Sequence, residues 1–380
     1  MSAIKTMRKL SSLLMAAMLL GPGIALADYE LNMTQSVTSV GKDMYDIHQL
    51  VMWICTVVGI GVFGVIIYSL INHRKSKGAV AAQFHESTTV EIIWTAIPLI
   101  ILVLIAIPAT KTLIEYENTA DSDVTIKATA WQWKWQYEYL DEGVSFFSNL
   151  DKASNEARQL KSGANVADVE HYLLNVDNPI VVPVGKKIRI LTTSNDVIHA
   201  WWVPELAVKR DAIPGYINES WFKAEKVGTY RGQCAELCGK DHGFMPIVVN
   251  VVEEAEYNQW VSAQKSAAAA AAAGADKTFT KDELMKRGAD VYAASCAACH
   301  QANGAGLPGV FPGLAGSAIA TGDAKGHIDI VVHGSKKNPA MGAYGPQLND
   351  VDLAAVITYE RNSWGNSASV VQPADVKAAR

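Results

Sequence analysis

The sequence has few cysteines and little net charge, and each of these features argues against a class of protein. Five cysteines in 380 residues are too few for a disulfide scaffold. A formal net charge of −5, from 33 basic and 38 acidic residues, argues against a nucleic-acid-binding protein. No internal repeat is evident. The chain is long enough for two or three domains, and its distinctive residues are concentrated in short segments.

The N-terminus has the layout of a secretory signal. Three basic residues precede an apolar run from Leu10 to Leu20, and Ala25-Leu26-Ala27 supplies small residues for cleavage. A retained anchor helix is the alternative, but the run is short and is broken by Gly21-Pro22-Gly23. We therefore predict a signal peptide over residues 1–27 that is cleaved after Ala27.

Two apolar segments, Ile47–Ile71 and Val90–Ala109, each have about the twenty residues needed to cross the hydrocarbon core of a membrane. The basic loop His73–Lys77 lies between them, and the positive-inside rule places such a loop in the cytoplasm. The sequence thus predicts a two-helix transmembrane hairpin over residues 28–118. Everything after Thr110 is then expected outside the cytoplasm.

Between residues 119 and 262 the pattern changes to short alternating runs. Residues 124–130 and 187–190 alternate apolar with polar side chains, and residues 246–252 form a buried-type strand. We predict an all-β sandwich or Greek-key barrel, with Trp131, Trp133, Trp135 and Tyr137 on one face of one strand. Residues 151–170 are polar and Ala-rich, and we expect a surface helix or loop inserted between strands, without an assigned function.

The segment from Cys234 to Met245 contains a compact set of metal ligands. Cys234, Cys238, His242 and Met245 supply two thiolates, an imidazole and a thioether, which select copper, zinc or iron–sulfur chemistry. His199, on a distant strand, is the candidate for a second imidazole. Two coppers can share both sulfurs, with one His each and Met245 as a weak axial ligand. A zinc site or a disulfide are the alternatives, although a disulfide has no need of the spare His and Met.

This ligand set, with His199 upstream, closely resembles the dinuclear copper centre of cytochrome c oxidase subunit II. The resemblance extends from about Asp43 to Trp260 and implies a cupredoxin fold for residues 119–262, with the metal loop between its last two strands. Besides the ligand segment, the matching stretches are Val90–Thr95, Trp131–Trp135, Val208–Gly215 and Met245–Val248.

The same resemblance implies roles for three further residues. The carbonyl of Glu236 would be an axial copper ligand, and its carboxylate would help to hold a magnesium ion at the boundary with the catalytic subunit. Trp133 matches the residue through which electrons reach the copper site, although cross-strand packing also explains it. Glu91 would lie at the mouth of a proton pathway that feeds the partner subunit. The alternatives are a solvated charge for Glu236 and a helix N-terminus for Glu91.

The C-terminal part of the sequence contains Cys296-Ala297-Ala298-Cys299-His300, the attachment sequence for a c-type haem. Cys296 and Cys299 would form thioethers to the porphyrin, and His300 would be the proximal iron ligand. A chance match or a redox dithiol are the alternatives. An Ala-rich linker at residues 263–277, predicted as a semi-rigid helical spacer, precedes this all-α domain at residues 278–380.

The sixth ligand of the haem iron is expected downstream of this sequence. Met341 lies in a loop before a predicted helix, Asp350 to Arg361, and His327 and His333 are its rivals. The segment from about Thr278 to Asn362 resembles class I cytochromes c, many of which have a proline directly after the ligand methionine. Gly342 occupies that position here.

These resemblances together predict subunit II of a proton-pumping, caa-type cytochrome c oxidase with a fused cytochrome c domain, in a bacterial cytoplasmic membrane. Electrons would pass from an external donor, such as a soluble or membrane cytochrome c, to the haem and then to two coppers. Subunit I, the catalytic partner, would reduce oxygen. The alternatives are a copper subunit of a nitric oxide reductase, a quinol oxidase subunit, and a membrane-tethered electron carrier without an enzyme partner.

Overall fold

The computed structural model describes residues 32–81, 83, 85–159, 163–338 and 341–380. The predicted signal peptide lies outside these residues. The chain divides into a short N-terminal unit, Met1–Thr34, and a unit that comprises Gln35–Arg380. The larger unit contains a helical hairpin, a β-sheet domain and a C-terminal helical domain, which are described one by one.

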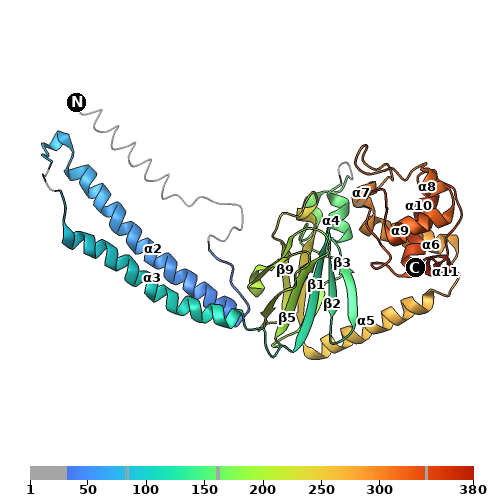
Figure 1. The fold of residues 1–380 in the computed structure, drawn as a ribbon, viewed down its shortest axis with the longest axis horizontal. Helices are drawn as coiled ribbons and strands as arrows, with labels where there is room; N and C mark the ends of the chain where they lie inside the picture. The colour runs from blue at the N-terminus through green and yellow to red at the C-terminus, as the bar shows by residue number, and fades with distance from the viewer. Residues whose placement is uncertain (1–31, 82, 84, 160–162, 339–340) are drawn as a thin grey trace. The chain divides into compact units, whose positions relative to one another are not determined.

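The helical hairpin consists of α2 (Ser39–Asn72) and α3 (Thr88–Tyr116), joined through the short 3₁₀ helix η1 (Lys75–Lys77). The two long helices run side by side (Figure 1). Both are long and apolar enough to cross a membrane, and their apolar side chains are exposed, as lipid-facing residues should be. They extend beyond the predicted spans at both ends, because a span is read from the apolar residues alone.

The β-sheet domain contains two five-stranded sheets within the described residues. Their orders are β3-β2-β1-β5-β8 and β4-β10-β9-β6-β7, and the parallel pairs are β1 with β5 and β4 with β10. The strands are β1 (Val124–Trp131), β2 (Lys134–Tyr139), β3 (Val144–Ser148), β4 (Ile180–Pro183), β5 (Ile188–Ser194), β6 (His199–Val203), β7 (Val208–Ala212), β8 (Asn218–Phe222), β9 (Gly228–Cys234) and β10 (Pro246–Val252).

The core of this domain follows from the alternation in the sequence. Ile126 on β1 and Ile190 on β5 are opposite one another in the parallel register, and both are completely buried. Ile247 and Val249 on β10 belong to the same buried cluster, so side chains from both sheets meet in one core. The predicted sandwich of short strands is confirmed.

The prediction that four aromatic residues share one strand is wrong. Strand β1 ends at Trp131, the chain reverses at Gln132 and Trp133, and β2 begins at Lys134. Alternation of side chains is the same for one long strand and for two strands joined by a two-residue turn, and this turn has no Gly, Pro or Asn to reveal it. Trp133 therefore lies in the turn and not on β2, and it packs half-buried against the core.

The segment between β3 and β4 contains the short helix α4 (Lys152–Ala157) and the 3₁₀ turn η2 (Val166–Asp168). Helix α4 is capped by Asp151, whose side chain accepts a hydrogen bond from the Ser154 amide. The hydroxyl of Ser154 in turn accepts from the Leu173 amide at 3.1 Å. The segment is thus a helix and loop inserted between strands, as the sequence predicts.

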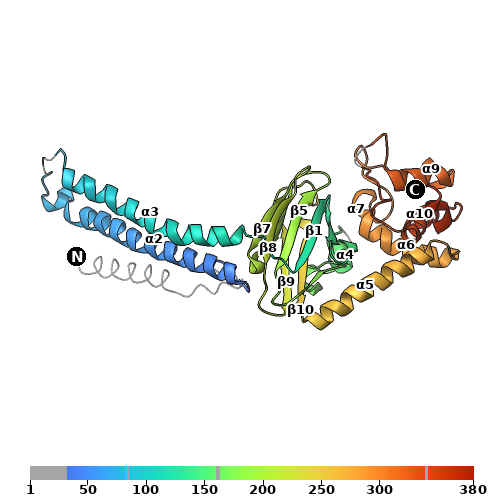
Figure 2. The same cartoon turned by 60° about the horizontal axis from the view of Figure 1, so that its bottom comes forward.

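Helix α5 (Glu254–Gly274) follows β10 directly as one uninterrupted helix (Figure 2). Its first turns pack Tyr257 and Val261 against the β-sheet core. The Ala-rich stretch is helical, as expected, but the helix begins at Glu254, well before the predicted linker at residue 263. Tertiary packing of the first turns extends a helix that composition predicts only for the alanines.

The C-terminal domain is all-α and has its own core. Helices α6 and α10 cross closely at Gly288, where an added Cβ would lie 2.1 Å from the Ala355 carbonyl oxygen. Helix α6 begins with a capping box formed by Thr280 and Glu283. The helices of this domain are α6 (Lys281–Ser295), α7 (Ala297–His300), α8 (Ala318–Thr321), α9 (Ala324–His333), α10 (Asp350–Asn362) and α11 (Pro373–Lys377).

Candidate metal centre and haem-binding cavity

Strand pairing brings the candidate metal ligands together. His199 is the first residue of β6 and Cys234 is the last residue of β9, and these two strands pair with Trp201 opposite Cys234. Cys238 lies in the loop that follows β9. The loop then forms the 3₁₀ turn η4 (His242–Phe244) and enters β10 after Met245. Ligands that are 46 residues apart at the extremes thus meet at one end of the sheet.

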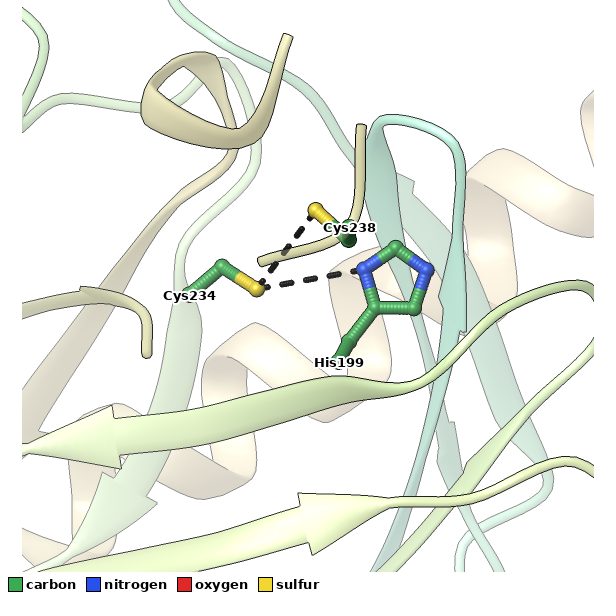
Figure 3. Close-up of side chains that lie close together, drawn as sticks. All are labelled: His199, Cys234 and Cys238. Carbon is green, nitrogen blue, oxygen red and sulfur yellow. Dashed lines mark hydrogen bonds between the residues drawn. The ribbon is translucent and has the colours of Figure 1, made fainter. Parts of the chain in front are cut away.

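The sulfur and nitrogen atoms lie close together. The sulfurs of Cys234 and Cys238 are 3.8 Å apart, and both cysteines are free thiols rather than a disulfide. Cys234 Sγ is 3.8 Å from His199 Nδ1, and Cys238 Sγ is 3.4 Å from His242 Nδ1. The Met245 sulfur lies 3.6 Å from Cys238 Sγ. Figure 3 shows the two thiols and the His199 ring directed toward one another.

This pairing of each thiol with its own imidazole suits two metal ions better than one. A single zinc ion needs four ligands around one centre, whereas here a third soft ligand, Met245, adjoins Cys238. His199, Cys238 and Met245 are almost completely buried, so water is excluded from most of the site. Soft ligands in a dry, compact site fit copper.

Hydrogen bonding within the pair favours a thiolate. The hydrogen bond from the Cys238 thiol lowers the pKa of Cys234 well below the usual range of a thiol, while the same contact raises the pKa of Cys238. Burial lowers the pKa of His199, but hydrogen bonds to Asp196 and Cys234 outweigh it and raise the pKa overall. If metal cations replaced the proton between the two sulfurs, both sulfurs could be thiolates at the same time.

Asp196 holds the His199 ring and was not anticipated from the sequence. Its Oδ1 lies 2.9 Å from His199 Nε2, which leaves Nδ1 facing Cys234. Metal-binding histidines commonly donate their second ring nitrogen to a carboxylate in this way. Asp196 also accepts a hydrogen bond from the Gln132 amide at 2.7 Å. The available signal was a carboxylate three residues before the candidate ligand.

The turn between β1 and β2 contacts the ligand loop. The indole nitrogen of Trp133 donates to the Cys238 carbonyl at 3.1 Å, and the Gln132 side-chain amide donates to the same oxygen at 2.8 Å. Trp133 therefore lies one hydrogen bond from a ligand residue. Gln132 had no signal in the sequence, because its role depends on the turn that the sequence does not reveal.

Glu236 and Glu91 occupy different environments. The backbone carbonyl of Glu236 lies 3.4 Å from Cys234 Sγ, so it borders the sulfur pair, while the residue itself is exposed. Glu91 lies in the first turn of α3, on the membrane hairpin, and is also exposed. The structure thus brings Glu236 to the candidate centre and leaves Glu91 in the transmembrane hairpin.

The C-terminal domain contains a largely apolar cavity whose wall includes Cys296, Cys299, His300 and Met341. His300 Nδ1 is 2.9 Å from the Pro312 carbonyl oxygen. A hydrogen bond there fixes the ring and leaves Nε2 for a metal ion. Two thiols, an oriented imidazole and a thioether around one apolar cavity fit a covalently attached haem.

The two rivals of Met341 differ in their surroundings. His333 Nε2 lies 2.7 Å from the Ala379 carbonyl oxygen, and His333 is exposed. His327 lines the cavity and is buried, with Nε2 2.8 Å from Glu360 Oε2 and with no hydrogen-bond partner at Nδ1. A buried nitrogen without a partner indicates that this cavity accommodates a further group.

Three protein-family models match successive segments of the chain. Residues 27–112 match the model of the cytochrome c oxidase subunit II transmembrane domain, and residues 124–252 match that of its periplasmic domain. Residues 283–359 match the model of cbb3-type cytochrome c oxidase subunit III. The C-terminal helical domain is thus similar to a different oxidase subunit from the rest of the chain.

Curated relatives match 63–64% of the chain. A probable cytochrome c oxidase subunit 2 of Rickettsia bellii is 36% identical over 241 residues, which are 63% of this chain and 86% of the relative. Cytochrome c oxidase subunit 2 of Arabidopsis thaliana is 36% identical over 248 residues, which are 64% of this chain and 93% of the relative. The crystal structure of the periplasmic domain of subunit II of cytochrome oxidase from Bradyrhizobium japonicum is 47% identical. The match covers 39% of this chain and 98% of the chain in that crystal structure, with a TM-score of 0.35.

Proposed function

Because this chain belongs to the cytochrome c oxidase subunit II family, we propose that its sulfur cluster is a dinuclear copper centre, fed with electrons by the fused cytochrome domain. The proposed ligands are the side chains of His199, Cys234, Cys238, His242 and Met245, with the carbonyl of Glu236. The observation that carries the assignment is the arrangement of two free thiols 3.8 Å apart, each beside its own imidazole. The chain is the electron-accepting subunit of an oxidase whose partner, subunit I, reduces oxygen.

Copper, when bound, supplies a one-electron redox centre. The protein's part is to hold the ligands still and dry, so that little reorganises when the charge changes. His199 is fixed by Asp196, Cys238 is fixed through its carbonyl by Trp133 and Gln132, and the sulfurs are buried. A rigid site of this kind suits electron transfer.

In the cytochrome domain, Cys296 and Cys299 would attach the haem, and His300 would bind its iron. Met341 is the proposed sixth ligand. It lines the same cavity as His300, whereas His333 does not, and His327, which also lines it, has its Nε2 engaged by Glu360. Haem iron held by His and Met is characteristic of electron-transfer cytochromes. An external cytochrome c is the proposed donor to this haem, and Trp133, bonded to the Cys238 carbonyl, is the proposed point at which electrons reach the copper ligands.

The chain is a membrane-anchored protein with a periplasmic domain, and we propose the bacterial inner membrane as its location. The proposed domains are the hairpin at 28–118, the copper domain at 119–262 and the cytochrome domain at 278–380, after a signal peptide at 1–27. The Glu236 carboxylate is proposed to help bind magnesium at the boundary with subunit I, and Glu91 to open a proton pathway into that subunit. An exposed carboxylate in each place is compatible with these roles.

Metal and haem analysis of the oxidase complex, purified in mild detergent, tests the proposal. Cys238→Ser should remove two coppers per complex, together with the spectrum of an electron shared by two copper nuclei. It should leave the metals of subunit I in place. Covalent haem should remain on the denatured subunit II band and disappear from a Cys296→Ser, Cys299→Ser variant. Retention of both coppers by Cys238→Ser would refute the copper assignment.

A further inference from the structure

Arg158 lies at the end of α4, in the segment inserted between β3 and β4, and its guanidinium makes three separate contacts. Its Nη1 lies 3.3 Å from Asp241 Oδ2, and its Nε donates to Asn155 Oδ1 at 2.7 Å. The guanidinium carbon is 4.4 Å from the centre of the Phe244 ring. A planar guanidinium can make an ion pair, a directed hydrogen bond and a ring contact at once.

Two of these three partners flank a candidate copper ligand. Asp241 precedes His242 and Phe244 follows it by two residues. The short turn between them is closed by a hydrogen bond from the Phe244 amide to the Asp241 carbonyl at 2.9 Å. Asp241 is buried, with only 4% of its surface exposed. A carboxylate at such a position needs a cationic or hydrogen-bonding partner, and Arg158 supplies the cation.

Helix α4 is itself anchored, so Arg158 is held against the ligand loop from a fixed base. The Asp151 amide donates to the Asn175 carbonyl at 3.1 Å, and the Leu173 amide donates to the Ser154 hydroxyl at 3.1 Å. Asn155 then orients the guanidinium through Nε. These contacts connect the inserted segment to the chain that leads into β4.

We propose that Arg158 is a positioning residue of the copper centre, which clamps the ligand loop at residues 239–245 and thereby fixes His242. The inference rests on the proposed function, because it assumes that His242 binds copper. It assigns a role to the inserted segment, which the sequence left without one. Arg158 and Asp241 neutralise one another, so the clamp adds rigidity beside the centre without adding net charge.

The test uses the full oxidase complex with Arg158→Gln, Arg158→Lys and, as a matched control, Arg189→Gln. Arg189 also pairs with a carboxylate, Glu219, but this pair joins strands β5 and β8, neither of which borders the ligand loop in sequence. Copper release to a chelator should be about 10- to 100-fold faster in Arg158→Gln, the usual effect of removing a residue that supports a metal ligand. The copper spectrum should change as well, while the absorbance of haem c stays as in the wild type.

The conservative variant separates a clamp from a general loss of stability. Arg158→Lys keeps the charge but lacks the planar fork, so its copper release should lie between that of the wild type and that of Arg158→Gln. If Arg158→Gln does not accumulate, Arg158→Lys alone decides: release at the wild-type rate refutes the clamp. Arg189→Gln should release copper at the wild-type rate, and acceleration equal to that of Arg158→Gln would refute the specific role of Arg158.

The outcome also distinguishes the clamp from the function on which it depends. A wild-type complex without a dinuclear copper spectrum would refute the proposed function, and the clamp with it. A wild-type complex that has this spectrum, together with an Arg158→Gln variant of unchanged spectrum and release rate, would refute the clamp alone.

Discussion

Replacement of Asp196 by alanine should weaken copper binding, because this carboxylate orients a ligand and the turn that covers the site. It accepts hydrogen bonds from His199 Nε2 at 2.9 Å, from the Gln132 amide at 2.7 Å and from the Val197 amide at 2.7 Å. Burial raises the pKa of Asp196, but the His199 hydrogen bond and the two amides outweigh it and lower the pKa. The carboxylate is therefore an anion in the folded protein, and hydrogen bonds to anions are the stronger kind.

The magnitude follows from what each variant removes. Loss of a residue that orients a metal-binding histidine typically costs about 10- to 100-fold in metal affinity, which corresponds to about 1.4–2.7 kcal/mol. Asp196→Ala should reach this range. Asp196→Asn keeps an oxygen that can accept from His199 but loses the negative charge, so its affinity should fall less than about tenfold. The expected order of affinity is wild type, then Asp196→Asn, then Asp196→Ala.

Chelator competition against the full oxidase complex, followed by the copper spectrum, measures these affinities. Asp177→Ala is the matched control, because Asp177 also accepts hydrogen bonds from a backbone amide and a side chain, but from Asn149 and not from a candidate copper ligand. Asp177→Ala should lower the thermal stability and leave the copper affinity unchanged. Equal copper loss in Asp177→Ala and Asp196→Ala would show that the effect is a general loosening of the domain, and the reasoning would fail.

Three further variants test other parts of the chain. Gly288→Ala places a Cβ 2.1 Å from the Ala355 carbonyl oxygen, so the free energy of unfolding, measured by thermal unfolding, should fall by about 1–3 kcal/mol or more. Gly326→Ala is the control: its Cβ meets nothing within 4 Å, so the free energy of unfolding should not fall. Met341→Ala should abolish the spectral signature of thioether ligation and open the iron to carbon monoxide, and an unchanged spectrum would assign the sixth position to another residue. Glu91→Gln should slow proton-coupled oxygen turnover and leave the rate of copper reduction intact; unchanged turnover would reject its role.

The local periodicity of apolar and polar residues was sufficient to predict much of the fold. The alternation in residues 124–130 predicts β1, because one face of that strand packs against the partner sheet. The ligand spacing predicts the sulfur cluster, since Cys234 and Cys238 are separated by a single short loop. His199 could be named because the site needs another imidazole, and its placement beside β9 is a property of the sheet.

The parts that sequence reasoning missed depend on contacts between distant residues. The reversal at Gln132 and Trp133 is a turn without turn-forming residues, held by hydrogen bonds to Asp196 and Cys238. The pairing of Arg158 with Asp241 joins residues 83 positions apart, and neither local spacing nor composition carries information about such a pair. In each case tertiary contacts decide a conformation that local propensity leaves open.

The fusion of donor and acceptor domains makes the connecting helix a testable part of the mechanism. A tether raises the effective concentration of the donor at the acceptor, by an amount that depends on its length and stiffness. Helix α5 has 21 residues and is thus roughly 30 Å long. Its first turns are fixed to the sheet domain by Tyr257 and Val261, so its stiffness limits the volume that the haem domain can explore.

Replacing Ala269 and Ala271 by glycine should therefore slow electron transfer from haem to copper without changing either centre. Each glycine disfavours the helix by about 1 kcal/mol, so the alanine stretch becomes a more flexible tether with the same number of residues. Flash-induced or stopped-flow reduction of the full complex measures the transfer rate, and Ala269→Leu, Ala271→Leu, which keeps the helix, is the control. An unchanged rate in the glycine variant would show that the domains find one another through their surfaces alone, and that the stiffness of α5 has no part in electron transfer.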